Sequence, residues 1–174
     1  MPPEAVRLAP HDPTWAAKAA EEATRLRAAA SRRLQRVHHI GSTAVAGLAA
    51  KPIIDLLGTA PDLAALDGAR STFEALGYEW KGEYGLTGRR YCRLDDPVSG
   101  ERRIHLHCYQ TDDPAIARLL AFRDLLRSSP RTAAEYEQEK RRCARLHPAD
   151  SGAYTACKGE WIRLIEGSLG VEPP

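Results

Sequence analysis

Long apolar runs, the residue pattern of a signal peptide and a strong excess of charge of either sign are all missing from this 174-residue sequence. No apolar run approaches the ~20 residues that cross a bilayer, so we expect no membrane partner. The first residues, Met1-Pro2-Pro3-Glu4, lack the basic segment and apolar stretch of a signal peptide, which predicts a cytoplasmic location. A formal net charge of +2 gives no strong nucleic-acid signal.

Cysteine is scarce and scattered. The sequence has four, and no two form a C-x-x-C pair, which argues against a zinc knuckle and a thioredoxin-type site. They are Cys92, Cys108, Cys143 and Cys157. In a reducing cytoplasm we expect four free thiols that behave as small hydrophobic side chains.

Repeats, low-complexity linkers and a P-loop are also absent from the sequence. With no break in composition, 43% hydrophobic content predicts a single domain over residues 1–174 with a sizeable core. The P-loop pattern G-x-x-x-x-G-K-[ST] is not met, because Gly41 and Gly47 are spaced wrongly and Lys51 comes too late. Oligomeric state is not readable from these features.

Apolar periodicity and turn residues predict the elements. Strands are expected over residues 5–8, 37–40, 52–59, 78–81, 89–94 and 102–109. Helices are expected over residues 15–34, 63–76, 114–128, 132–146 and 153–169. A leading helix, a strand-rich middle and a helical C-terminal part indicate an α+β (α/β) domain, a sheet flanked by helices.

The stretch from His39 to Leu57 carries the first candidate site. Its second apolar strand contains one acid, Asp55, and a buried carboxylate must be paired, protonated or bound to a cation. The Gly41-Ser42 turn before it can present backbone N–H groups and a hydroxyl to a phosphate oxygen, although such a turn is common without a ligand. Lys51 can reach a ligand on the same edge, or it is an exposed loop lysine.

A second candidate lies in the segment Arg103-Ile104-His105-Leu106-His107. Strand alternation places Arg103, His105 and His107 on one face and the aliphatic residues on the other. Two histidines at this spacing can chelate a divalent metal, and a cation-rich face can hold a triphosphate. The alternative is the solvent-facing polar side of a sheet. Neighbouring arginines suit phosphate recognition or serve as surface charge.

These motifs resemble the GrpB family. The resemblance covers nearly the whole length and rests on the following residues of this sequence: Asp12-Pro13-x-Trp15, His39-Ile40-Gly41-Ser42-Thr43, Gly47-Leu48-Ala49-Ala50-Lys51-Pro52-Ile53-Ile54-Asp55, His105-Leu106-His107, Phe122-Arg123-Asp124-x-Leu126-Arg127, Glu135-Tyr136 with Lys140, and Tyr154 with Lys158. It implies a nucleotidyltransferase-like fold, with a mixed β-sheet flanked by helices.

Fold relatives of this family hold nucleotide phosphates with a Gly-Ser loop, and two Mg²⁺ with an Asp-x-Asp/Glu pair and a third acid. The resemblance assigns the loop to Gly41, Ser42 and Thr43 and the first acid to Asp55. The sequence departs from the pattern at Leu57, which stands where the second acid is expected.

On a later strand, His105 and His107 stand where the third acid would be sought. With Asp55 they are the expected catalytic and metal-binding residues, while Lys51 and Arg103 are expected to neutralise phosphate. The metal would be Mg²⁺ or Mn²⁺, or Zn²⁺ in view of the imidazoles.

The resemblance therefore implies a nucleotide-binding, nucleotidyltransferase-like enzyme that transfers or activates a phosphate-bearing group on an unknown small-molecule acceptor. A nucleoside triphosphate would be its substrate. One alternative is a non-catalytic nucleotide-binding module that lost the second acid. Another is a metal-dependent hydrolase or ligase using Asp55, His105 and His107. Fusion of relatives to dephospho-CoA kinase suggests a nucleotide or coenzyme context.

Overall fold

The computed structural model describes residues 5–170, so the first four residues, on which the signal-peptide expectation rests, lie outside it. Its centre is a five-stranded mixed sheet in the order β1-β2-β5-β4-β3. The strands are β1 (Arg36–Ile40), β2 (Ile54–Ala60), β3 (Glu79–Trp80), β4 (Arg90–Asp95) and β5 (Arg102–Gln110). Strands β2 and β5 run parallel, and the other neighbouring pairs are antiparallel.

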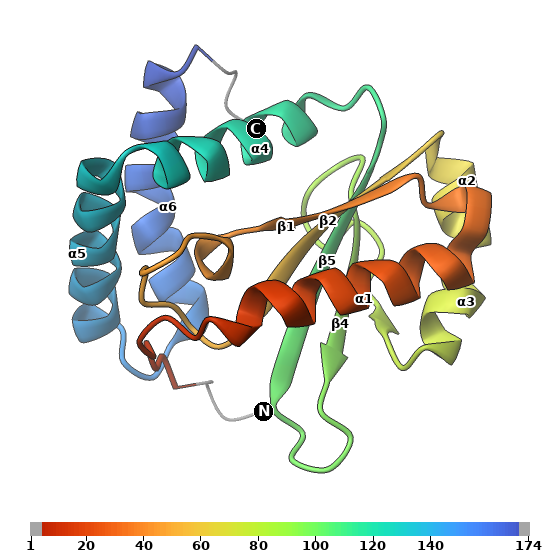
Figure 1. Ribbon diagram of the computed structural model, residues 1–174, viewed down its shortest axis with the longest axis horizontal. Coiled ribbons are helices and arrows are strands. Elements are labelled where there is room, and N and C mark those ends of the chain that lie inside the picture. Colours follow the sequence, from red (N-terminus) through yellow and green to blue (C-terminus); the bar gives the residue numbers. More distant parts are fainter. Residues whose placement is uncertain (1–4, 171–174) are drawn as a thin grey trace.

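Six α-helices and two short 3-10 turns surround the sheet (Figure 1). They are α1 (Thr14–Ala30), η1 (Ser31–Arg33), η2 (Ser42–Ala44), α2 (Leu63–Gly68), α3 (Arg70–Ala75), α4 (Pro114–Ser128), α5 (Pro130–Leu146) and α6 (Ser151–Ser168). In Figure 1, α1 crosses in front of the strands, and α4, α5 and α6 gather away from α2 and α3. Among the described residues, no helix combines the length and apolar character needed to cross a membrane.

The two faces of the sheet bury different kinds of side chain. Even-numbered positions of β2 and β5 enter the main apolar cluster with α1 and α3, as strand alternation predicts. Its fully buried members include Leu26, Leu56, Phe73, Leu106 and Cys108. On the opposite face, Leu57 and Tyr109 pack under Ile116 and Leu119 of α4. Asp55, His105 and His107 lie on this second face.

The helix boundaries follow their capping residues. Asp62 accepts a hydrogen bond from the Ala65 N–H at the start of α2, and Asp113 accepts one from the Ala115 N–H just before Pro114 opens α4.

The prediction of a single helix over residues 63–76 is wrong, because the chain forms two helices, α2 and α3, that are separated at Ala69. The glycine at position 68, a poor helix former, lies at that break.

Two further predictions need correction. No strand forms over residues 5–8; instead, Ala9 pairs with Ala50 as an isolated bridge. The four cysteines are not all free, since Cys143 of α5 and Cys157 of α6 form a disulfide. Cys92 and Cys108 are buried free thiols, as expected. The Cys143–Cys157 disulfide could not be predicted from the spacing of the cysteines, because it depends on α5 and α6 packing side by side.

Candidate functional site

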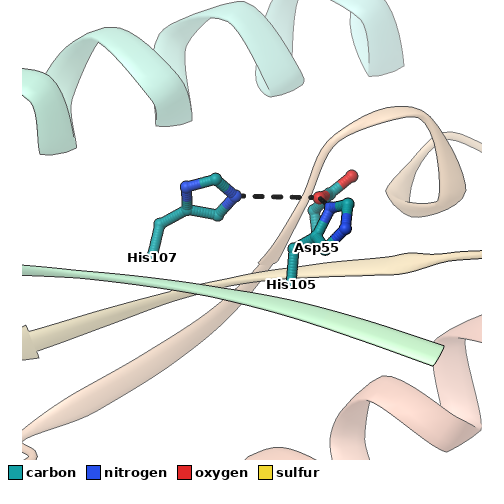
Figure 2. A group of neighbouring side chains, drawn as sticks. All are labelled: Asp55, His105 and His107. Carbon is teal, nitrogen blue, oxygen red and sulfur yellow. Dashed lines mark hydrogen bonds and ion pairs between the residues drawn. The ribbon is translucent and has the colours of Figure 1, made fainter. Parts of the chain in front are cut away.

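Asp55, His105 and His107 converge on one side of the sheet (Figure 2). The parallel register of β2 and β5 places Asp55 opposite His105, so the side chains of neighbouring strands meet. His105 Nδ1 lies 3.1 Å and His107 Nε2 3.8 Å from Asp55 Oδ1. The three side chains remain 30%, 25% and 22% exposed, respectively, so a ligand can reach them.

Gly41 adjoins the other oxygen of this carboxylate. It ends β1, with φ of 72° and ψ of −171°, a backbone region that is essentially restricted to glycine. A Cβ at Gly41 would lie 2.5 Å from Asp55 Oδ2, so only glycine allows this approach. The Gly41-Ser42 turn and the Asp55 carboxylate are therefore neighbours in space, as the sequence led us to expect.

Cationic side chains from α4 and α5 hold the end of β1 and the loop that follows this turn. Arg123 donates to the His39 carbonyl at 3.2 Å, and Arg127 donates to the Ala44 carbonyl at 2.8 Å. The buried Lys140 donates to the Ala49 carbonyl. Because loop carbonyls are otherwise costly to bury, these contacts fix the loop against the C-terminal helices.

Thr43 is buried in the loop, and its hydroxyl makes a hydrogen bond with His39 Nε2 at 2.8 Å. Thr43 therefore has a structural partner, while Ser42 remains half-buried at the start of η2. Burial, opposed by Asp55 and reinforced by Arg127 and Arg123, lowers the pKa of His39 to about 4. His39 is neutral at pH 7 and can accept the hydroxyl proton.

Each histidine of the central group also faces an arginine. Arg102 Nη1 lies 3.5 Å from His105 Nε2, and Arg89 Nη1 lies 3.5 Å from His107 Nδ1. A guanidinium has donors only, so these ring nitrogens act as acceptors, and each ring directs its N–H to Asp55. The sequence did not place Arg89 or Arg102 in the site, since strand register decides which arginine meets which histidine.

The charge state of Asp55 follows from these contacts. Burial alone raises the pKa of the carboxyl, but the hydrogen bond from His105 and the close approach of His107 outweigh it, and the pKa falls well below its usual range. Burial lowers the pKa of His107, against the opposing effect of Asp55. At pH 7 the site therefore contains an ionised carboxylate beside a neutral His107.

Helix α6 brings a further cation, Lys158, toward the carboxylate. The pKa of Lys158 is raised, chiefly by Tyr136, against desolvation and with further contributions from Tyr154 and Asp55. Its Nζ lies 5.6 Å from the centre of the Tyr154 ring. The sequence places Lys158 among the residues of the family resemblance but assigns it no place in the site. Local sequence patterns do not indicate that α6 lies near β2.

Two of the expected phosphate-binding residues have other partners. Lys51 Nζ donates to Ser151 Oγ at 2.8 Å, at the start of α6. Arg103 is exposed and lies 3.8 Å from Asp96 in the turn between β4 and β5. The structure thus brings Gly41, Ser42 and Asp55 together with the histidines, whereas Lys51 contacts Ser151 and Arg103 lies near Asp96.

The order of the sheet and the placement of the Gly-Ser turn beside a strand carboxylate define a nucleotidyltransferase-like fold. The chain is similar to Cid1 in complex with its short product ApU, with a TM-score of 0.54 and 15% identity over 78% of this chain and 42% of that one. The profile of the family described as GrpB protein matches residues 5–167. The chain belongs to the GrpB family.

Individual relatives agree with this assignment. The crystal structure of conserved protein GrpB from Enterococcus faecalis matches with a TM-score of 0.85 and 39% identity, covering 93% of this chain and 96% of that one. The UPF0157 protein YqkA of Bacillus subtilis (strain 168) is 38% identical over 95% of this chain. A dephospho-CoA kinase of Mycolicibacterium paratuberculosis is 34% identical over 91% of it. This chain spans 47% and 44% of those two proteins.

Proposed function

We propose that this chain binds a nucleoside triphosphate beside Asp55 and transfers its nucleotidyl group to the hydroxyl of a small-molecule acceptor. The observation that carries the proposal is the close approach of Asp55 Oδ2 to Gly41, where an added Cβ would lie 2.5 Å from that oxygen. It joins a turn suited to phosphate oxygens with a carboxylate suited to a cation, in a fold similar to that of Cid1.

The charges around the site support an anionic ligand. Asp55 is the acid at its centre, and Arg89, Arg102 and Lys158 approach it or its histidines. Guanidinium groups pair well with phosphate oxygens, and a triphosphate brings several such oxygens. We assign phosphate binding to Gly41 and Ser42 of the turn.

The orientation of the His105 and His107 rings decides which atoms of the site are suited to bind a divalent metal. A metal-ligating imidazole donates its other N–H to an acceptor, but here the outer nitrogens of His105 and His107 face guanidinium donors. The rings therefore suit holding Asp55 better than binding metal. Asp55 Oδ2, on the side of the Gly41 turn, suits Mg²⁺ or Mn²⁺ that also binds triphosphate oxygens. Such a metal would offset charge on the phosphates.

His105 and Asp55 have the arrangement of a general-base pair. Asp55 accepts the Nδ1–H of His105 and thereby leaves Nε2 with a lone pair. In the proposed step the acceptor oxygen forms a bond to the α-phosphorus, the bond from that phosphorus to the bridging oxygen breaks, and pyrophosphate leaves. The acceptor hydroxyl takes the place of the Arg102 N–H beside His105 Nε2, and its proton passes to that nitrogen and then to solvent.

The test measures nucleotide binding and turnover with and without Mg²⁺ or Mn²⁺. Asp55→Asn keeps the shape of the side chain and removes its charge, so it should abolish metal-dependent turnover. The exposed Asp112→Asn is the matched control and should behave as the wild type. Ser42→Ala should weaken nucleotide affinity while the fold persists. Full turnover by Asp55→Asn would refute the assignment of Asp55.

Leu57 favours a second candidate function, a nucleotide-binding module without catalysis. It occupies the expected position of the second acid, cannot ligate a metal, and is fully buried under α4. Metal-independent nucleotide binding without any product would support this module. Metal-dependent product formation would support the enzyme.

A further inference from the structure

An exposed aromatic ring stands beside the candidate site, in the loop over residues 81–89 that joins β3 to β4. Tyr84 is 59% exposed, although its ring stacks on Tyr91 with centroids 5.1 Å apart and planes 14° apart. One surface of the ring is thus fixed on the protein while much of the side chain meets solvent. An aromatic ring held in this way offers a flat surface to a ligand.

The loop holds Tyr84 in a costly conformation. Its φ of 46° lies in the left-handed region, which is unfavourable for a bulky residue. The buried Arg89 stabilises the turn by donating to the carbonyl oxygens of Tyr84 at 2.6 Å and Glu83 at 3.2 Å. Non-glycine residues held in this region gather at ligand-binding sites. Apolar packing alone does not account for an exposed ring kept in such a conformation.

The stack connects Tyr84 to the central group. The Tyr91 ring lies 5.2 Å from the His107 ring and 5.7 Å from the His105 ring, measured between centroids. Arg89, which holds the loop, also lies over Tyr91 at 5.0 Å and faces His107. The Tyr91 ring therefore lies between Tyr84 and the two histidines beside Asp55.

We propose that Tyr84 is the stacking surface for the base of the nucleotide whose phosphates bind beside Asp55. The proposal rests on the proposed function and assigns a base subsite that the phosphate-binding residues do not provide. Stacking accepts any base, so the subsite should bind adenine and uracil nucleotides with similar affinity. Loss of one base–aromatic stack corresponds to about a 5- to 150-fold loss of affinity.

The experiment compares ATP, UTP and inorganic tripolyphosphate by calorimetry with Mg²⁺ present. Tyr84→Ala should weaken binding of both nucleotides at least about fivefold and leave tripolyphosphate binding unchanged. Tyr84→Gly removes the ring and also relieves the left-handed backbone, so it supplies a ringless variant that folds. Tyr84→Phe should bind as the wild type. Leu86→Ala, at another exposed apolar side chain of the same loop, is the matched control and should change nothing.

The outcomes separate the two proposals. If the wild type binds tripolyphosphate and nucleotides, but ringless variants bind ATP normally, the base subsite is refuted and the proposed function stands. An equal loss of tripolyphosphate and nucleotide affinity in Tyr84→Gly also refutes the subsite, because the ring would then act through the phosphate region. If the wild type binds neither ligand, both proposals fail.

Discussion

Replacing Gly41 with alanine should disturb both the fold and the candidate site. The added Cβ would lie 2.5 Å from Asp55 Oδ2, closer than real contacts allow, and 3.0 Å from Asp55 Cβ, which is tighter than most real contacts. The backbone of Gly41 cannot relax freely, because its φ of 72° and ψ of −171° connect β1 to η2. The Asp55 side chain must therefore rotate away from its histidine partners, or the turn must open.

The expected loss of unfolding free energy in Gly41→Ala has two parts. An alanine in this backbone region costs about 1–3 kcal/mol, and disrupting a hydrogen bond to a charged group costs about 1.5–3 kcal/mol. Gly41→Ala should thus destabilise the fold by about 2.5–6 kcal/mol. Gly47→Ala is the matched control, since Gly47 also has a positive φ, 78°, but a Cβ there meets nothing within 4 Å. Gly47→Ala should show only the destabilisation that comes from placing alanine in an unfavourable backbone conformation.

Urea denaturation followed by circular dichroism measures both variants, with the slope m checked for two-state behaviour. The difference between the two glycine variants reports the contact with Asp55. Introducing Asp55→Ala into both should remove most of that difference, because the clashing oxygen is gone. Equal destabilisation by Gly41→Ala and Gly47→Ala in the wild-type background would refute the close approach of Gly41 to the carboxylate.

Three further predictions concern buried and cross-linked residues. Burial, with Lys158 nearby, lowers the pKa of Lys140 to about 7, so the free energy of unfolding should rise with pH from about 7 to 10.5. In urea titrations, Lys140→Met should remove about 2 kcal/mol of that rise between pH 7 and 9. Reducing the Cys143–Cys157 disulfide should cost up to about 3 kcal/mol and lower the melting temperature, whereas a Cys143→Ser/Cys157→Ser variant should not respond to reductant. Leu57→Asp should destabilise the fold by at least about 3 kcal/mol in denaturant, because it buries an unpaired carboxylate.

Strand alternation was sufficient to predict the two faces of β5. Arg103, His105 and His107 were placed on one face and Ile104 and Leu106 on the other, and the exposed and buried positions follow that pattern. The family resemblance gave the fold and the loop beside Asp55. The sequence alone could only suggest that Asp55, His105 and His107 meet. Whether they do depends on β2 pairing with β5 in the observed register.

Long-range partners account for the features that the sequence did not predict. Arg89 and Arg102 were known as members of an arginine-rich segment, but their contacts with His107 and His105 arise from the β4–β5 hairpin. Lys158 reaches the site from α6, about one hundred residues beyond Asp55 in the chain. Local patterns carry no information on such distances, since the hydrophobic period of a helix fixes its buried face and leaves its neighbour undetermined.

The exchange of an acid for Leu57 fits the path of α4. On β2, Asp55 and Leu57 point to the same face, yet Leu57 packs with Ile40 and Tyr109 beneath that helix. An acid at this position would lie among apolar side chains, so the change from polar site to core occurs within two residues of one strand. Catalysis that uses two metals held by paired acids has no second ligand on β2. Under the proposed function, the charge of a triphosphate would therefore be offset by cations such as Arg89, which faces His107, and Lys158, whose pKa Asp55 helps to raise.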